Sequence, residues 1–332
     1  MKPSIDPREP WNGTVVIDRT DRARLWVGGP DRGRFLHNLT TNEVKRLEAG
    51  SGREAFVTSP QGKTLAFVIM HAIEDRILVR ADPGGLEHAL PHFQKYGALD
   101  DVELDDASRS TCELHLIGPG PYPSWMPTVA AEPEYSCAVA TASGETLYVI
   151  RESPTGFPGL TVITPESLRE RILNDLAGAG ATELEPERFE GLRIWAGTPV
   201  FGREVTPANL PQELGRDDRA ISFIKGCYLG QETVARIDAV GHVNRILKGL
   251  RFAAGARVPA IGSRLLDGEK VVGAATSAAP SPFDGSPIAL AFVKTAHAQA
   301  GTRLAVAPPD GGKLEWAVVA DLPMTHSPPG AP

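Results

Sequence analysis

The chain has 332 residues, 42% of them hydrophobic and 23% charged, with a formal net charge of −7. This length predicts two or three domains, and the composition is typical of a globular protein rather than a disordered one. The acidic balance argues against general binding to nucleic acid.

The three cysteines, Cys112, Cys137 and Cys227, are far apart and form no CxxC pair. This spacing predicts neither a zinc site nor a cluster-binding loop, so we expect the chain itself to bind no metal. The first residues mix charges with prolines, unlike a signal peptide, and no apolar run reaches the roughly 20 residues of a membrane span. The sequence therefore predicts a cytoplasmic protein with no membrane contact and no direct contact with nucleic acid.

The first third of the chain contains both strand and helix patterns. Runs of β-branched residues predict strands, and apolar residues recurring every three or four positions predict helices. We expect the first two strands to form a hairpin and the later strands to form a meander. The predicted elements are strands at 14–18 and 23–27, a helix at 32–39, strands at 55–58, 64–71 and 76–81, a helix at 84–95 and a strand at 102–104.

The rest of the chain first alternates between strands and helices and then changes to short strands broken by glycine and proline. A loop at 206–218 is expected to line a cleft, and six strands after residue 243 predict a small barrel or sandwich. The further predicted elements are strands at 112–117, 145–151 and 159–163, helices at 166–176 and 186–196, and strands at 247–252, 263–266, 271–277, 288–293, 303–306 and 314–319.

One stretch, residues 225–236 with the sequence KGCYLGQETVAR, gathers an amine, a thiol, a phenol, an amide, a carboxylate and a guanidinium. Its glycines permit a sharp turn, and the good helix formers from Gln231 onward predict a helix. The free N–H groups at such a helix start favour a thiolate or a bound carboxylate, and we expect Cys227 to lie beside them. A lone cysteine is more often an inert buried side chain, so both interpretations of Cys227 stay open.

The charged residues of this stretch allow a functional and a structural interpretation. Glu232 and Arg236 are four residues apart, the spacing of an ordinary helix pair worth about 0.3–0.5 kcal/mol. Between residues 225 and 251, five basic side chains stand against two acidic ones. This local positive balance suits an anionic small molecule, and it is equally typical of a solvated face.

The run KGCYLGQETVAR resembles the signature of the folate-binding YgfZ family, which shares the three-domain fold of the glycine cleavage T-protein, an aminomethyltransferase that uses tetrahydrofolate. Four other segments resemble the same pattern: GRFLHNLTT at 33–41, LHLIGP at 114–119, GLRIWAGTP at 191–199 and VGAATS at 272–277. The resemblance implies that Cys227 is the functional thiol. It also implies that a tetrahydrofolate-type ligand is contacted by Lys225, Tyr228, Gln231, Glu232 and Arg236.

The resemblance further implies an α+β fold of two modules with antiparallel sheets and a C-terminal small β-barrel. We expect residues 1–48 and 108–240 to form a first, discontinuous α+β domain that carries the KGCYLGQE motif. Residues 49–107 are expected to form an α+β domain inserted into it, and residues 241–332 to form the barrel.

Three positions depart from the T-protein pattern. Leu65 occupies the position of its catalytic aspartate, and Phe157 and Trp195 occupy the positions of two acids that hold the folate pterin. A pterin presents a donor and acceptor edge that carboxylates match, so these changes imply weaker or differently oriented folate binding. Leucine offers neither charge nor hydrogen bond, so we expect no cleavage of aminomethyl groups from a lipoyl carrier protein.

The leading interpretation is a folate-binding accessory protein that supports assembly or repair of iron–sulfur proteins and, through them, tRNA modification. Its expected partners are a reduced folate and iron–sulfur client or assembly proteins. Two alternatives stay open: a tetrahydrofolate-dependent aminomethyltransferase, against which Leu65 argues, and a non-catalytic scaffold that uses the motif as a docking surface.

Overall fold

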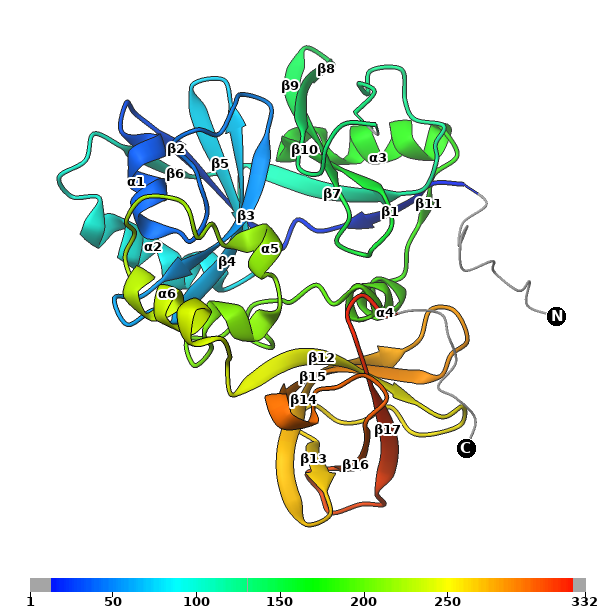
Figure 1. Ribbon diagram of the computed structural model, residues 1–332. Helices are drawn as coiled ribbons and strands as arrows, with labels where there is room; N and C mark the ends of the chain where they lie inside the picture. The colour runs from blue at the N-terminus through cyan, green and yellow to red at the C-terminus, as the bar shows by residue number, and fades with distance from the viewer. Residues whose placement is uncertain (1–12, 130, 325–332) are drawn as a thin grey trace.

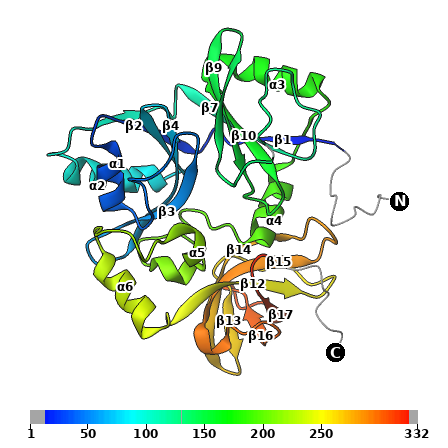
Figure 2. The ribbon, with the colours of Figure 1, turned by 45° about the horizontal axis from the view of Figure 1, so that its top comes forward.

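The computed structural model describes residues 13–129 and 131–324. Two sheet units lie side by side above a barrel, with helix α4 (Pro186–Ala196) between them and the barrel (Figure 1). In the turned view, the connecting segment with α4 and α5 (Asp217–Ala220) lies in the middle (Figure 2). Within the described ranges, no helix is both long and apolar enough to cross a membrane. The N-terminal segment, for which no signal peptide was predicted, lies outside the described residues.

The first unit is an antiparallel five-stranded sheet with two helices, α1 (Arg32–Leu39) and α2 (Gly85–Tyr96). Phe35 and Leu36 of α1 and Phe93 of α2 are buried in one apolar cluster with the strands, which fixes both helices on the sheet. In pairing order the strands are β3 (Gly52–Thr58), β4 (Thr64–Ile73), β5 (Arg76–Ala81), β2 (Ala23–Gly28) and β6 (Glu103–Asp106).

The second unit is a six-stranded sheet in which β11 runs parallel to β1 and the other neighbours are antiparallel. Helix α3 (Arg169–Gly178), which follows the 3-10 turn η1 (Glu166–Leu168), buries Ile172 and Leu176 against this sheet. In pairing order the strands are β11 (Thr182–Glu183), β1 (Val15–Asp18), β7 (Thr111–Ile117), β10 (Gly159–Pro165), β9 (Glu145–Glu152) and β8 (Cys137–Ala142).

The third unit is a closed six-stranded barrel, which confirms the α+β fold with a C-terminal β-barrel. Its interior is an apolar cluster that includes Leu250, Leu265 and Val293. A 3-10 turn, η3 (Thr295–His297), follows the second strand of the barrel order. That order is β12 (Arg245–Phe252), β15 (Pro287–Lys294), β14 (Lys270–Pro280), β13 (Arg264–Asp267), β16 (Arg303–Ala307) and β17 (Glu315–Ala320).

Between α4 and the barrel, the chain forms the 3-10 turn η2 (Pro211–Leu214), α5 and then α6 (Gln231–Val240). Helix α6 begins at Gln231, the position from which the helix was predicted. Gly230 is its N-cap residue with a φ of 86°, a left-handed conformation that glycine adopts without steric cost.

The predicted hairpin of the first two strands is wrong, because the two strands belong to different sheets. Strand β1 pairs with β7 and β11, whereas β2 pairs with β5 and β6. In the turn between them, the Arg19 N–H donates to the Glu113 carbonyl of β7 at 2.7 Å, which holds the chain at the boundary of the two sheets. The sequence pattern of two short strands and a turn is the same in both arrangements.

The same crossing changes where the inserted unit begins. The predicted division grouped residues 1–48 with 108–240, but β2 and α1 share the sheet and the apolar cluster of residues 52–106. The structure thus groups 23–39 with the inserted sheet and leaves β1 with the other one.

Candidate functional site

A narrow cavity lies where the two sheet units meet the connecting segment. Its free volume is about 30 Å³, room for roughly two water molecules. The aromatic residues Phe67, Tyr135 and Phe189 form part of its wall. Its charged lining residues are five arginines, Arg19, Arg22, Arg193, Arg216 and Arg219, and three acids, Glu54, Asp82 and Glu152.

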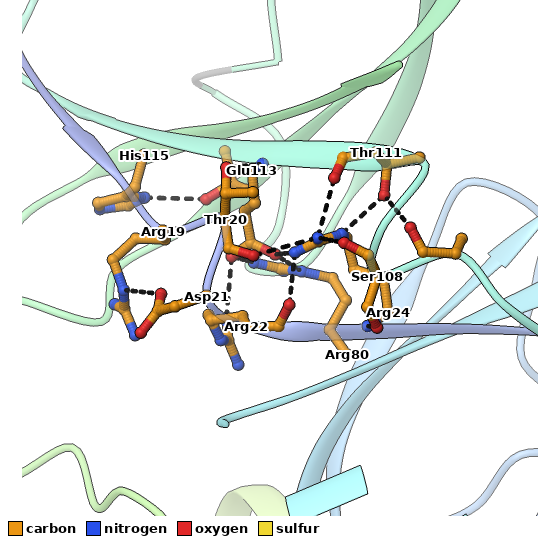
Figure 3. Close-up of polar contacts among 12 residues, drawn as sticks. Arg19, Thr20, Asp21, Arg22, Arg24, Arg80, Ser108, Thr111, Glu113 and His115 are labelled. Carbon is orange, nitrogen blue, oxygen red and sulfur yellow. Dashed lines mark hydrogen bonds and ion pairs between the residues drawn. The ribbon is translucent and has the colours of Figure 1, made fainter. Parts of the chain in front are cut away.

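Behind one wall, Arg80 of β5 joins the two sheets (Figure 3). Its guanidinium donates to both oxygens of Glu113 of β7 at 3.1 and 2.6 Å and to both oxygens of Glu152 of β9 at 2.8 and 2.9 Å. Its remaining contact is with His71 Nε2 at 3.3 Å. Both carboxylates are bound in a bidentate manner, which requires the planar guanidinium of arginine and is not possible for lysine.

A second buried acid, Glu54 of β3, ties the five-stranded sheet to the connecting segment. It accepts from Arg216 Nε at 2.7 Å, forms an ion pair with Arg219 at 3.0 Å, and accepts from the Tyr135 hydroxyl. Burial raises the pKa of Glu54, but Arg216 beside it more than offsets burial and holds the pKa below its usual range.

A third buried group joins α4 to the barrel. Arg193 of α4 donates to the Thr198 carbonyl at 2.6 Å and to the Ser277 hydroxyl of β14 at 2.9 Å, and it pairs with Glu190 and Glu204. Glu204 in turn accepts from Ser277 at 2.6 Å. These bonds hold one side of the cavity at a fixed place relative to the barrel.

The predicted site residue Lys225 binds backbone carbonyls of the first unit. Its buried amine donates to the carbonyls of His37, Thr40 and Asn42 at 2.6, 2.6 and 2.8 Å, so it occupies the carbonyls at and just beyond the end of α1. Its Nζ also lies 4.7 Å from the centre of the Tyr228 ring. The donors of Lys225 are thus used by backbone carbonyls, which gives this residue a structural role, and its expected contact with a folate-type ligand stays a prediction. Burial lowers the pKa of Lys225 to about 7.

The next residues of the motif also pack against the first unit. Tyr228 is buried in an apolar cluster between the five-stranded sheet and the barrel, and burial raises the pKa of its hydroxyl. The Leu229 N–H donates to the Asn38 carbonyl at 2.8 Å, and its carbonyl accepts from Thr58 at 2.6 Å. A Cβ at Gly230 would lie 2.4 Å from the Ser59 carbonyl oxygen, so only glycine fits there.

Cys227 is the exposed cysteine of the three. It lies in the loop four residues before the first residue of α6. Cys112 is buried and Cys137 is partly buried, and burial raises the pKa of each thiol to about 12. Cys227 is thus the thiol that a reagent or a partner protein can reach in the folded protein.

The remaining predicted contacts lie on α6. Gln231 is partly exposed, and Glu232 and Arg236 are exposed, with no ion pair between them in the described structure. The basic residues between 225 and 251 also do not form one positive surface, because Arg245 pairs with Glu213 and Lys248 pairs with Asp321. None of the six predicted site residues from 225 to 236 is among the residues that line the central cavity.

The three positions that carry acids in the T-protein pattern have apolar side chains here. Leu65 of β4 is partly buried against the cluster of the five-stranded sheet. Phe157 and Trp195 both pack on Phe283, with ring centres 6.2 and 4.8 Å apart. The two positions therefore lie beside one aromatic ring, that of Phe283. In the described part of the chain, no group of three or more His, Cys, Asp and Glu could hold a metal ion.

Fold and cavity together define a protein of two α+β units and a β-barrel, with an arginine-lined cavity where the two sheet units meet the connecting segment. The model of the GCVT N-terminal domain matches residues 11–223, and that of the glycine cleavage T-protein C-terminal barrel domain matches residues 245–324. The chain therefore belongs to the glycine cleavage T-protein family.

Several relatives share most of the chain. An aminomethyltransferase of Streptomyces coelicolor is 28% identical over 299 residues, which cover 86% of this chain and 80% of the relative. A chloroplastic protein of Arabidopsis thaliana is 27% identical over 300 residues, 89% of this chain and 68% of the relative. The crystal structure of the glycine cleavage system aminomethyltransferase T from Bartonella henselae superposes with a TM-score of 0.82 at 19% identity, covering 94% of this chain and 86% of that one. This likeness shows the same fold.

Sequence reasoning did not find the cavity residues. Arg19 and Arg22 lie in the turn that was interpreted as part of a hairpin, and Arg216 lies in the loop that was expected to line a cleft. The loop prediction was the one signal that pointed toward this cavity. The arginines of the β1–β2 turn belong to no recognisable sequence motif. They reach the cavity only because the chain crosses from one sheet to the other at this turn.

Proposed function

We propose that the protein is a tetrahydrofolate-dependent transferase of the aminomethyltransferase type that binds a reduced folate in the central cavity. The observation that carries this proposal is the match to the T-protein family in both its parts, 11–223 and 245–324. Relatives named as aminomethyltransferases cover more than four fifths of the chain. They support this function better than the accessory role that the motif resemblance implied.

The cavity offers chemistry that suits such a ligand. Its aromatic wall can stack on a flat ring, and its arginines can bind the carboxylates of the glutamate part of a folate. A folate ring is larger than the present free volume, so binding requires lining side chains to move apart. Arg219, at 45% exposed, is a lining side chain with access to solvent.

The experiment is a transfer assay with an aminomethylated lipoyl carrier protein as donor and tetrahydrofolate as acceptor. Formation of methylenetetrahydrofolate above a control without the protein supports the proposal. Folate binding without any product would reject the aminomethyl transfer, and no binding at millimolar folate would leave only the docking scaffold.

A second candidate function is support of iron–sulfur protein assembly or repair, as the YgfZ resemblance implies. Two observations favour it: Leu65 provides no carboxylate at the expected catalytic position, and Cys227 is exposed within the motif 225–236. In this case the protein binds a reduced folate but forms no methylenetetrahydrofolate. The activity of iron–sulfur enzymes, including those of tRNA modification, then falls in cells that lack the protein and is restored by the wild type but not by Cys227→Ala.

The Leu65→Asp variant separates the two candidates further. If the protein transfers aminomethyl groups, an added carboxylate at this position is expected to raise the rate of transfer, because it supplies the acid that the T-protein pattern carries there. If the protein is an accessory factor, the variant gains no transfer activity. Leu65→Asn is the matched control for size without charge.

A further inference from the structure

The buried charges in and behind one wall of the central cavity do not balance. Four arginines, Arg19, Arg22, Arg24 and Arg80, lie together with three carboxylates, Glu113, Glu152 and Asp82. Asp21 also approaches Arg19, at 3.9 Å, but its side chain is 66% exposed and its charge is screened by water.

The two histidines in this cluster do not change the balance. Burial lowers the pKa of His71 to about 3 and that of His115 to about 4, so both rings are neutral near pH 7. The buried cluster therefore carries one positive charge in excess. A buried uncompensated charge is costly, and an anion beside it would be bound strongly.

The four arginines of this cluster differ in how many of their hydrogen-bond donors have partners. Arg80 uses its donors on Glu113, Glu152 and His71, and Arg24 donates to Thr111 and to the carbonyls of Arg22, Thr20, Ser108 and Thr111. Neither guanidinium belongs to the cavity wall. The other two arginines of the cluster, Arg19 and Arg22, line the cavity and make fewer hydrogen bonds.

Arg22 is the buried arginine of this cluster that still has an unpaired hydrogen-bond donor. Its side chain is 8% exposed, and it donates to Glu113 at 3.2 Å through Nη1. Its buried Nε has no hydrogen-bond partner in the described structure, since Asp82 Oδ1 at 3.5 Å is in ion-pair range only. Arg19, 16% exposed, lies 3.9 Å from the same carboxylate and 4.6 Å from the centre of the Phe189 ring. Both guanidiniums extend to the same side, away from the strand that carries Glu113 (Figure 3).

We propose that Arg22, together with Arg19, binds a carboxylate group that enters the central cavity. The cavity has a free volume of about 30 Å³, which admits a carboxylate without movement, whereas a ring system needs lining side chains to move apart. Arg22 Nε would gain a partner, and the carboxylate would neutralise the excess charge of the cluster. This inference rests on the proposed function only for the source of the carboxylate: it is either the glutamate part of a folate or a separate small carboxylate substrate.

The test compares calorimetric titrations of the wild type and the Arg22→Met variant with three probes: tetrahydrofolate, tetrahydropteroate, which lacks the glutamate, and L-glutamate. The Arg22→Met variant leaves three arginines for three carboxylates, and Glu113 keeps its paired bonds with Arg80, so the variant is expected to fold. The Arg264→Met variant, changed at an exposed position of strand β13 of the barrel, is the control for loss of a charge outside the cavity.

If the folate supplies the carboxylate, Arg22→Met weakens tetrahydrofolate binding by roughly tenfold or more and leaves tetrahydropteroate unchanged. If a separate substrate supplies it, L-glutamate binds the wild type and loses this binding in Arg22→Met, while the two pterins bind both proteins alike. Arg264→Met behaves as the wild type in either case.

The inference is overturned if Arg22→Met binds every probe as the wild type does, even though folate binding would stand. Binding of L-glutamate through Arg22 with no binding of either pterin would uphold the inference and reject the folate proposal. Loss of all binding in all proteins would reject both. Should Arg22→Met fail to fold, Arg19→Met with the same probes gives the same comparison, and Arg22→Lys tests the planar fork at constant charge.

Discussion

At the scale of single residues, the motif 225–236 separates into a structural part and an exposed part. Lys225, Tyr228 and Gly230 are buried or closely packed against the first unit, whereas Cys227 reaches solvent between them. A functional thiol needs such exposure, and a rigid frame on both sides gives it a fixed place.

Alkylation of the folded protein tests this division. Iodoacetamide is expected to modify Cys227 first, while Cys112 and Cys137 react only after unfolding, because burial holds their pKa at about 12. Peptide mass spectrometry over time measures the three rates. Cys227→Ala is expected to change the free energy of unfolding by less than about 0.5 kcal/mol, as for an exposed side chain. Equal rates at all three cysteines would contradict the structure.

Lys225 is expected to stabilise the end of α1. The Lys225→Met variant leaves three carbonyls without their donor, which costs about 1–3 kcal/mol in the free energy of unfolding, measured by urea denaturation at pH 7. Lys248→Met, which removes an ion pair to the exposed Asp321, is the control and should cost less than about 1 kcal/mol.

The same residue gives a dependence on pH. Its pKa is about 7 in the folded protein and roughly 10.4 in the unfolded chain, so the unfolded state binds more protons between these values. The free energy of unfolding of the wild type should therefore rise from pH 7 toward pH 10 relative to that of Lys225→Met. Parallel pH profiles of the two proteins would show that the three carbonyls hold the amine protonated throughout.

At the scale of elements, two glycines explain how α6 meets the β3–β4 turn. Gly230 lies against the Ser59 carbonyl, and a Cβ at Gly62 would lie 2.6 Å from the Thr233 Cβ. Any side chain at either place pushes α6 away from the turn, since backbone atoms cannot yield as a flexible side chain can.

Two glycine variants at the ends of α6 test this contact. Gly230→Ala combines a left-handed backbone with a Cβ at 2.4 Å from a carbonyl oxygen, so it is expected to cost more than about 3 kcal/mol in the free energy of unfolding. Gly241→Ala has a similar φ of 96° with nothing within 4 Å, and it should cost only about 1–2 kcal/mol of backbone strain. Equal costs would mean that the close approach to Ser59 is absent.

At the scale of the whole molecule, buried ion pairs join units that are distant in sequence. Arg80, Glu113 and Glu152 connect the two sheets, and Arg193 and Glu204 connect α4 with the barrel. Removing Arg80 leaves two buried carboxylates short of their main partner. Arg80→Met is therefore expected to cost about 3–5 kcal/mol in the free energy of unfolding, by urea denaturation.

Arg22→Met provides the matched comparison for Arg80→Met. Its loss removes the excess positive charge and one bond to Glu113, so its cost is expected to be at least about 2 kcal/mol smaller. A larger cost for Arg22→Met than for Arg80→Met would contradict the charge balance described for this cluster.

Most strands, most helices and the barrel were predictable, because their signals are local: residue periodicity, β-branched runs and turn residues. The strands β8 (Cys137–Ala142) and β11 (Thr182–Glu183) were not predicted. The role of Lys225 was not, since its three carbonyl partners lie more than 180 positions earlier in the chain. The place of Arg22 was also hidden, because a strand–turn–strand pattern is the same for a hairpin and for a crossing between sheets. Cys227 was singled out by the motif and lies exposed, but its chemistry stays a prediction.

Hydrogen exchange with and without tetrahydrofolate tests most directly whether a reduced folate binds in the central cavity. We expect the ligand to slow amide exchange in the cavity segments, around Phe67 of β4 and at Arg193 to Val200, while the loop around Cys227 exchanges at an unchanged rate. Protection confined to the Cys227 loop and α6, or no protection anywhere at millimolar tetrahydrofolate, would contradict a folate site in this cavity.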